Sequence, residues 1–143
     1  MTGEAAPASI AGPTVKVVRG GDTRVGKQGS AYRPGVSDET AGSTNIWLGM
    51  IVLPAGRRTS AHSHQRHETA LLMTAGEEIE IWSGARLERH DRVRPGDYLF
   101  IPAGVPHVAV NPSAADALFL GARNDPRANE GVVLMPELDA AVP

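Results

Sequence analysis

Positions 56 to 76 decide the fold and read Gly-Arg-Arg-Thr-Ser-Ala-His-Ser-His-Gln-Arg-His-Glu-Thr-Ala-Leu-Leu-Met-Thr-Ala-Gly. His62, His64 and Glu68 lie within seven residues of one another in this stretch. Side chains alternate between the two faces of a β-strand, so a strand here puts both imidazoles on one face, close enough to bind a single metal ion. Glu68 has the same parity as His64, and its carboxylate can reach the same ion if the strand continues or turns tightly.

A second stretch, from Gly96 to Asn111, supplies a further histidine. It reads Gly-Asp-Tyr-Leu-Phe-Ile-Pro-Ala-Gly-Val-Pro-His-Val-Ala-Val-Asn, so His107 follows a turn rich in proline and glycine. A lone His-x-His pair is more often surface decoration, or a buried pair satisfied by backbone carbonyls. Here four of the five histidines fall in two stretches with matching glycines and prolines, which favours a metal site. The predicted ligands are His62, His64, Glu68 and His107.

The other two histidines receive different interpretations. His90 lies in the charged segment Leu-Glu-Arg-His-Asp-Arg and is predicted to be a solvated surface residue. His67 differs in parity from His64 and so points away from the ion, which favours a supporting or surface role over ligation.

Both stretches resemble the two motifs of the cupin superfamily. The first motif has the form Gly, five residues, His-x-His, three or four residues, Glu, six residues, Gly. The chain departs from it at one point, because seven residues separate Glu68 from Gly76. The second motif is Gly, five residues, Pro-x-Gly, two residues, His, three residues, Asn, and it is matched without a gap. The matching residues are Gly56, His62, His64 and Glu68 in the first motif, and Gly96, Pro102, Gly104, His107 and Asn111 in the second.

The resemblance covers about Val15 to Pro136, and Ala122 to Arg127 is similar to a poorly characterised bacterial cupin subgroup. It implies an all-β fold, the cupin double-stranded β-helix, which is a jelly-roll-like open barrel. Many short apolar runs about ten residues apart, separated by Gly and Pro, independently favour a β-sandwich or barrel.

Length and composition limit the class of protein. A chain of 143 residues is expected to form one domain, which we place at residues 14–143 after a disordered arm at residues 1–13. The net charge of −2 argues against nucleic-acid and membrane-surface partners, so a small molecule is the expected partner. The absence of cysteine restricts metal ligands to nitrogen and oxygen. No apolar run of signal length is visible at the start, and a cytoplasmic location is the default expectation.

Several runs predict individual strands. Ile46–Leu53 is continuously apolar, as in a strand buried on both sides, and Glu78–Ile81 alternates. Further strands are predicted at Tyr98–Ile101, Val105–Val110 and Ala117–Leu120. Val15–Val18 is a short β-prone run, followed by a weakly structured segment up to residue 41. Because such barrels leave sheet edges exposed, we expect a homodimer, with Val15–Val18 as the exchanged strand.

Three imidazoles and one carboxylate suit one divalent ion. Four protein ligands on an octahedral ion leave two positions open, for a bidentate substrate or for a substrate and dioxygen. We favour Fe(II), with Mn, Ni, Cu and Zn as alternatives. Glu68 is the only candidate catalytic side chain, because no other acid or base is evident beside it.

Substrate contacts are predicted from parity and residue type. Ala70 and Leu72 share the parity of Glu68 and are expected to face the interior. Leu72 also stands where related sequences often have tyrosine, which removes a hydroxyl that could act as an acid. The aromatic candidates are Tyr32, Trp47, Trp82 and Phe119, although such residues are usually core filler. Arg33 and Arg123 are candidates to pair with an anionic substrate, although arginines are usually solvated.

Two classes of function follow. The first is a metal-dependent enzyme, for which we favour a non-haem oxygenase acting on a small chelating metabolite over a lyase or isomerase. The second is a cupin that uses the same ion to hold a small molecule without turning it over.

Overall fold

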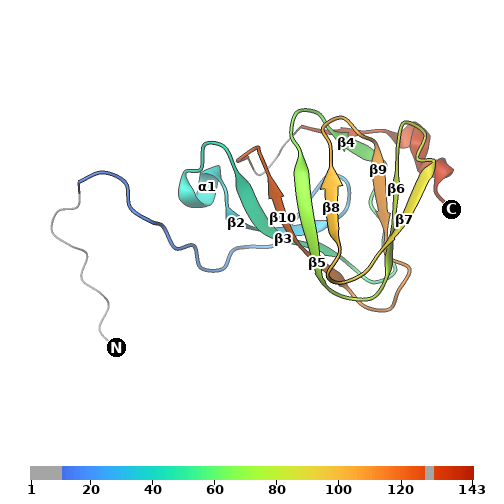
Figure 1. Cartoon of the computed structure of the whole chain (residues 1–143), viewed down its shortest axis with the longest axis horizontal. Coiled ribbons are helices and arrows are strands. Elements are labelled where there is room, and N and C mark those ends of the chain that lie inside the picture. The colour runs from blue at the N-terminus through green and yellow to red at the C-terminus, as the bar shows by residue number, and fades with distance from the viewer. Residues whose placement is uncertain (1–10, 128–130) are drawn as a thin grey trace.

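The computed structural model describes residues 11–127 and 131–143, so most of the arm predicted at residues 1–13 lies outside the described part. Nearly all regular structure is β, which confirms the predicted all-β class (Figure 1). The elements are β1 (Arg24–Val25), β2 (Ala31–Val36), α1 (Asp38–Ala41), β3 (Trp47–Leu53), β4 (His62–His64), β5 (Thr69–Ala75), β6 (Ile79–Ser83), β7 (Arg89–Val93), β8 (Tyr98–Ile101), β9 (His107–Val110), β10 (Ala117–Arg123), β11 (Val132–Leu134) and the 3₁₀ helix η1 (Pro136–Ala141).

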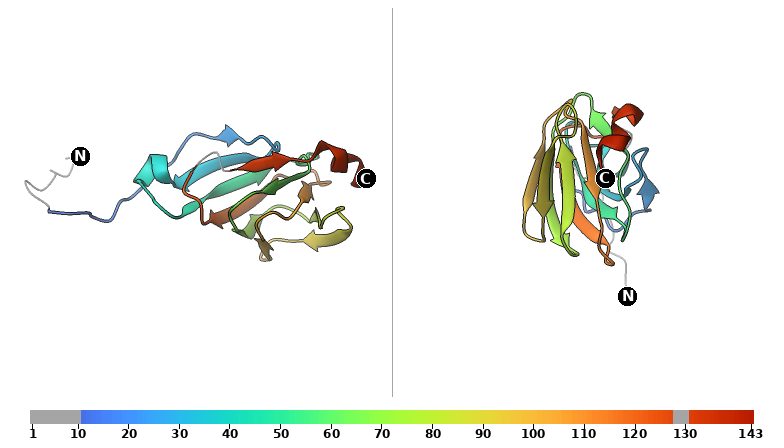
Figure 2. Two further views of the ribbon diagram at one scale, coloured as in Figure 1. Left: turned by 90° about the horizontal axis from the view of Figure 1, so that it is seen from above. Right: turned by 90° about the vertical axis from the view of Figure 1, so that its right-hand side faces the viewer.

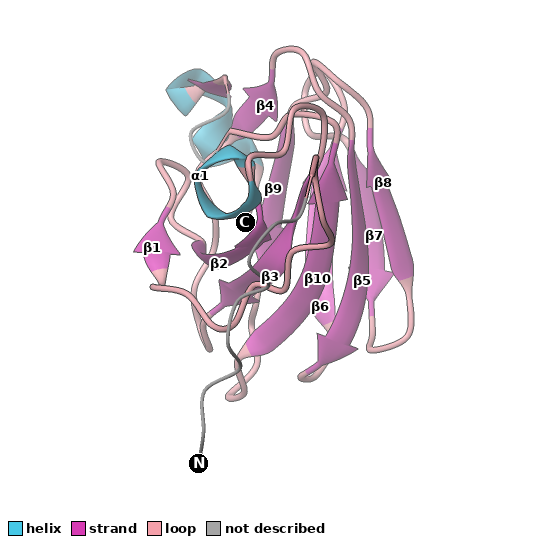
Figure 3. Ribbon diagram, turned by 90° about the vertical axis from the view of Figure 1, so that its left-hand side faces the viewer, coloured by secondary structure: helices cyan, strands magenta, loops and turns pink. Residues whose placement is uncertain are grey.

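Two antiparallel sheets make up the barrel. One has six strands in the order β1-β2-β3-β10-β5-β8, and the other has five in the order β11-β4-β9-β6-β7. Strands distant in sequence are therefore neighbours, such as β3 and β10, which are paired along their whole length from Trp47↔Arg123 to Leu53↔Ala117. The views in Figures 2 and 3 show the two sheets stacked as layers, and the left view of Figure 2 shows α1 and η1 at opposite ends of the barrel.

The main core lies between the two sheets at the end away from β4. Met73 and Ile79 have no exposed surface, and Phe119 is 5% exposed. The six buried members of this cluster are Leu53, Met73, Ile79, Val93, Ala117 and Phe119. Every strand that contributes to it alternates an inward with an outward side chain. This core holds the sheets apart and leaves the opposite end for the histidines.

A smaller core closes the outer face of the five-stranded sheet. Leu87 and Val108 pack there with Val142 at the end of η1. Arg58 ties this end to the barrel, because its guanidinium donates to the backbone oxygens of Val142 (3.2 Å) and Asp139 (3.2 Å). The C-terminal segment thus covers strands β4 and β9, which carry the site.

The sequence predicts the central strands well and the N-terminal part less well. β3, β6, β8, β9 and β10 lie within two or three residues of the predicted runs. The segment before residue 41 is more ordered than expected, because β2 pairs with β3 over Ala31–Val36. Val15–Val18 forms no strand within the chain, and Val15 is 93% exposed. No helix in the described residues is long and apolar enough to cross a membrane.

Candidate metal centre

Three histidines meet at one end of the barrel. His62 and His64 come from β4, and His107 is the first residue of β9. One ring nitrogen from each residue lies within 4.8 Å of the other two, and all three side chains are buried. The period of two along β4 puts His62 and His64 on the same face, as predicted.

The backbone fixes the orientation of two of these rings. Nδ1 of His62 lies 2.7 Å from the carbonyl oxygen of Ser60, and Nδ1 of His107 lies 2.9 Å from that of Val105. A carbonyl only accepts hydrogen bonds, so each Nδ1 carries the proton and donates it. The lone pair of each Nε2 is then left for a metal ion, as is usual for ligating histidines.

The turn before His107 also holds β4 in place. The amide of Gly104 donates to the carbonyl oxygen of His64 at 2.7 Å. Gly104 has a φ of 78°, a left-handed conformation that suits glycine best. The proline- and glycine-rich turn therefore positions both motif stretches relative to each other.

Burial keeps the three imidazoles neutral. Desolvation lowers the pKa of His62, and it lowers the pKa of His64 to about 2, with further contributions from the neighbouring histidines and Arg123. Desolvation, together with His62, lowers the pKa of His107 to about 3. Metal ligation needs the neutral form of histidine, so these rings are ready to bind without first losing a proton.

The arrangement fits a single divalent ion. Two nitrogens bound to one ion at about 2.1 Å each lie at most about 4.2 Å apart. The observed span of up to 4.8 Å is close to that limit, and small rotations of the rings are enough to close it. His62, His64 and His107 are therefore the residues that would hold the ion. The donor set alone does not select among Fe, Mn, Ni, Cu and Zn.

The fourth predicted ligand lies elsewhere. Among the described residues, the metal-ligand group contains no carboxylate, and the Glu68 side chain is exposed. Thr69 is buried and borders the same cavity as the three histidines. The prediction placed Glu68 by extending the parity of β4 across the loop, but β5 starts afresh at Thr69 with the opposite alternation. The prediction for Glu68 as both ligand and catalytic residue is corrected accordingly.

The other two histidines also have clear positions. His67 is 2% exposed, with its ring centroid 4.7 Å from that of His64 and its Nδ1 3.3 Å from Thr69 Oγ1. This favours the supporting role over the surface role. His90 stacks on Trp82 at 4.1 Å, with its Nε2 2.7 Å from a Glu80 carboxylate oxygen, on the other side of the five-stranded sheet.

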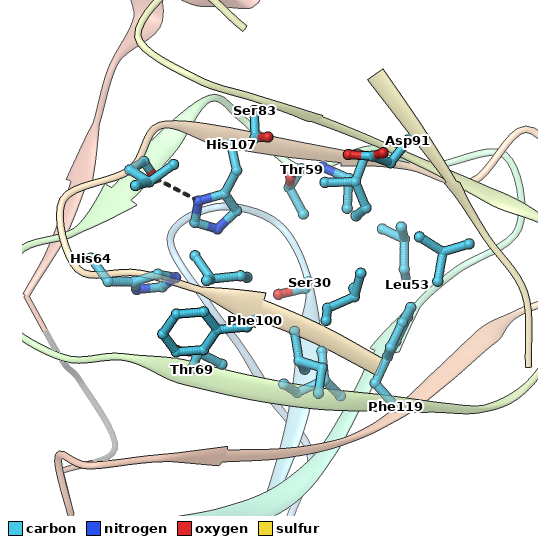
Figure 4. A pocket seen from close by; sticks show the side chains of 18 of the residues that line it. Ser30, Leu53, Thr59, His64, Thr69, Ser83, Asp91, Phe100, His107 and Phe119 are labelled. Atoms are coloured by element: carbon cyan, nitrogen blue, oxygen red, sulfur yellow. Dashed lines mark hydrogen bonds between the residues drawn. The ribbon is translucent and has the colours of Figure 1, made fainter. Parts of the chain in front are cut away.

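A cavity of about 510 Å³ opens onto the three histidines (Figure 4). Much of its wall is aliphatic or aromatic, with hydroxyl groups from a few serines and threonines. The apolar lining residues include Ile51, Leu53, Leu71, Ile81, Leu99 and Phe119, and the hydroxyl-bearing ones include Ser30, Thr59, Thr69 and Ser83. Such a site favours a small molecule that presents a polar group to the histidines and an apolar body to the wall.

The predicted substrate residues are divided between the cavity and other places. Phe119 lines the cavity and also belongs to the main core. Ala70 and Leu72 do not line it, because Thr69 and Leu71 hold the inward positions of β5. Leu72 does not face the cavity, so the absence of a tyrosine hydroxyl at this position no longer bears on acid catalysis in the site.

The predicted aromatic and basic contacts are corrected in the same way. Trp47 is buried in the barrel wall beside Tyr32, and Trp82 packs under η1, so neither is among the residues that line the cavity. Arg33 is exposed. Arg123, the other basic candidate, does line the cavity and lies over the Trp47 ring at 4.0 Å.

Comparison with known proteins agrees with this site. A profile described as a cupin domain matches residues 49–122, which is more than half of the chain. The chain belongs to the cupin family. No curated protein sequence matches it significantly.

Several solved structures share its fold. The polyketide cyclase RemF from Streptomyces resistomycificus is 19% identical with a TM-score of 0.63, over 90% of this chain and 92% of that one. A cupin-superfamily sugar phosphate isomerase from Silicibacter pomeroyi is 18% identical with a TM-score of 0.56, over 78% and 75%. The DMSP lyase DddQ from Ruegeria pomeroyi is 25% identical with a TM-score of 0.54, but this chain covers only 44% of its length.

Proposed function

We propose that this cupin is a metal-dependent enzyme that oxygenates a small chelating substrate with an apolar body. The observation that carries the proposal is the cavity, in which three neutral, buried imidazoles stand at one end of a mostly apolar chamber of about 510 Å³. The closeness of the three ligand nitrogens supports one ion for each chain.

The residues of the chain divide the work between holding and shielding. His62, His64 and His107 would hold the ion, which when bound supplies Lewis acidity and, if it is Fe(II), one-electron chemistry with dioxygen. Leu71, Phe119 and their aliphatic neighbours exclude water from the substrate body. The hydroxyls of the cavity can orient a polar substrate group by hydrogen bonds.

The scarcity of carboxylates beside the histidines favours this reaction class. Two carboxylates border the cavity, Asp91 and Asp97. Asp91 is paired with the exposed Arg89 at 3.1 Å, and Asp97 accepts the backbone N–H of Arg94 at 2.9 Å. Figure 4 shows Asp91 at the other end of the cavity from His64. Chemistry that depends on a carboxylic acid beside the ion therefore has less support than chemistry that does not.

A redox-neutral lyase, isomerase or cyclase reaction is the second candidate. It is favoured by the solved structures of similar fold, which are a lyase, an isomerase and a cyclase. A cupin that only binds its ligand is the third candidate. These three candidates differ in whether oxygen is consumed and whether product appears.

The test is an oxygen-electrode assay of protein loaded anaerobically with Fe(II). Catechols, β-diketones, 2-oxo acids and thiols form the panel, with product analysis by mass spectrometry. The proposal expects substrate-dependent oxygen uptake by the wild type and by His90→Ala, and none by His107→Ala. Product without oxygen uptake would support the redox-neutral candidate, and tight binding without product would support the binding protein.

A further inference from the structure

We propose that Thr69 replaces the carboxylate of the metal site, and that the resulting neutral three-histidine donor set selects an anionic chelating oxygen ligand. The proposal rests on the metal centre of the proposed function and is independent of its oxygen chemistry. It names a substrate class, namely oxygen chelators that bind as anions. The site keeps the three histidines of the motif but has Thr69 where the motif has a carboxylate.

The spacing of the first motif allows two alignments. Glu68 leaves three residues after His64 but seven before Gly76. Thr69 leaves four residues after His64 and six before Gly76, which matches the motif on both sides. The structure follows the second alignment, because Thr69 borders the cavity with the three histidines.

Hydrogen bonds on both sides of β5 fix this alignment. Thr69 is in register with Ile101 on β8 and with Arg123 on β10. The backbone N–H of Glu68 donates to the side-chain oxygen of Asn124 at 2.9 Å, just before the strand begins. Turning Glu68 inward requires a shift of one residue, which would move Leu71 and Met73 out of the core. The exposed position of Glu68 is therefore built into the sheet.

The charge of the site follows from this exchange. Three neutral imidazoles leave both charges of a divalent ion uncompensated, whereas a carboxylate ligand would cancel one. Arg123 borders the same cavity, and its guanidinium adds to the positive potential there. A ligand that carries its own negative charge on two oxygens, such as an enolate or catecholate, would supply the missing compensation.

The experiment measures anion binding without turnover. Protein is loaded with Co(II), whose visible spectrum reports ligand changes, and is titrated with tropolone as a monoanionic bidentate probe. The variants are Thr69→Glu, which restores a carboxylate, Thr69→Val, which keeps the shape but removes the hydroxyl, and Glu68→Gln. We expect Thr69→Glu to weaken tropolone binding at least tenfold, while Thr69→Val and Glu68→Gln bind it within threefold of the wild type.

Two results would overturn the proposal. One is loss of Co(II) affinity or a changed Co(II) spectrum in Glu68→Gln, which would make Glu68 a ligand. The other is unchanged tropolone affinity in a folded, Co(II)-loaded Thr69→Glu protein. If Thr69→Glu does not fold, the Glu68→Gln spectrum still decides between the two residues. Failure of oxygen uptake in the assay above leaves this titration unaffected, so the two proposals fail separately.

A second, independent observation concerns the outer face of the six-stranded sheet. Almost all side chains on this face are apolar. Among the outward-facing residues given below, Arg33, at one margin of the face, is the single charged one. Tyr98 is 79% exposed, Phe100 62%, Leu48 39% and Leu120 38%. Tyr98 and Phe100 are also among the residues that border the cavity, but their high exposure places their side chains mainly in solvent. The residues with outward parity on β2, β3, β10, β5 and β8 are Ala31, Arg33, Leu48, Met50, Val52, Leu118, Leu120, Ala122, Ala70, Leu72, Thr74, Tyr98 and Phe100.

The strands of this sheet have the pattern of strands covered on both sides. β3 reads Trp-Leu-Gly-Met-Ile-Val-Leu, and β8 reads Tyr-Leu-Phe-Ile, with no charged residue on the outward positions. A sheet that faces water on one side normally alternates apolar and polar residues. The outer face of the six-stranded sheet therefore has the composition of a buried surface, although nothing in the described part of the chain covers it.

We propose that a second copy of the chain covers this face. Two such faces can meet without burying unpaired charge, since Arg33 lies at the margin. Five strands about 4.8 Å apart and five residues of about 3.4 Å each give a footprint on the order of 400 Å² per copy. A standard interface needs about 800 Å² per partner. The exposed run Val15–Val18, with Val15 at 93% and Val17 at 69%, can supply further apolar area.

Sedimentation velocity at micromolar concentration tests this interface. The wild type is expected at twice the chain mass of 15.0 kDa, and Leu120→Glu at the mass of one chain. Leu134→Glu is the matched control, since Leu134 is a 46% exposed leucine on the other sheet, and it should remain dimeric. A wild type at 15.0 kDa, or a dimeric Leu120→Glu with native circular dichroism, would overturn the proposal.

Discussion

His62 and His107 face each other across β4 and β9, with ring centroids 4.2 Å apart. They are the only pair of residues in register between these two strands. β4 is thus joined to its sheet by few backbone contacts on this side, at the point where the imidazoles meet. An ion bound by both rings would link the strands where their backbone pairing is weakest.

Metal binding is therefore expected to stabilise the fold strongly. At a metal concentration one hundred times the dissociation constant, linkage adds about 2.7 kcal/mol to the free energy of unfolding. Thermal unfolding at pH 7.5, with Co(II) and with a chelator, measures this difference. His107→Ala serves as the control and should melt at one temperature under both conditions. Identical melting of the wild type with and without saturating Co(II) would contradict this expectation.

Acidification should destabilise the metal-free protein through the same three residues. In the unfolded chain a histidine titrates near pH 6.5, whereas burial lowers the pKa of His64 to about 2 and that of His107 to about 3, and lowers that of His62. Between pH 6.5 and about 3 the unfolded chain therefore binds more protons, and stability falls as the pH falls.

The loss should approach about 1.4 kcal/mol per pH unit for each histidine. Urea unfolding at pH 7.5, 6.0 and 5.0 in the presence of chelator would measure it. His107→Ala should flatten the dependence on pH, and His90→Ala should leave it as in the wild type. A pH dependence that is the same in all three proteins would rule out the buried rings as its source.

Asn111, the last residue of the second motif, is expected to have a structural role. It is 1% exposed, and its amide donates to the carbonyl oxygens of Leu53 (3.0 Å) and Ala115 (2.8 Å). Its oxygen accepts from the backbone N–H and hydroxyl of Ser113. Asn111→Ala should lower the free energy of unfolding by about 2–4 kcal/mol, because several buried partners lose their hydrogen bonds. Metal content of the folded protein should be unchanged, and a loss of metal without a loss of stability would contradict this role.

Leu71 and Leu72 form a matched pair that tests the alternation of β5. Leu71 lines the cavity and packs against the main core, whereas Leu72 belongs to the outer face. Leu71→Ala should cost about 2–3 kcal/mol and Leu72→Ala less than about 1 kcal/mol in urea unfolding. Equal costs, or the reverse order, would show that the strand is displaced by one residue.

The sequence predicts those parts of the structure that depend on local patterns. The continuous apolar runs identify β3, β8 and β10, and the period of two in His62-Ser-His64 brings two ligands to one face. The second motif fixes the position of His107, because its glycines and prolines specify the turn that precedes it. These features need no knowledge of distant contacts.

The sequence predicts badly which face of a strand a residue occupies when a loop separates that strand from the previous one. His64 and Thr69 belong to different strands in different sheets, so the phase of β5 is set by its pairing with β8 and β10. Glu68, Ala70 and Leu72 were placed by carrying the phase of β4 through that loop. The seventh residue between Glu68 and Gly76 was the available signal for the shift. Likewise, Trp82 was predicted to contact the substrate, but it packs against the small core under η1. No local sequence pattern indicates this long-range contact.

The central claim, a metal centre made of three histidines, is tested most directly by elemental analysis of purified protein after reconstitution and desalting. We predict one divalent ion per chain in the wild type and in Glu68→Gln, and less than one tenth of an ion per chain in His62→Ala and His107→Ala. His90→Ala should match the wild type. Full occupancy in His62→Ala or His107→Ala, or an empty Glu68→Gln protein that is folded, would contradict it.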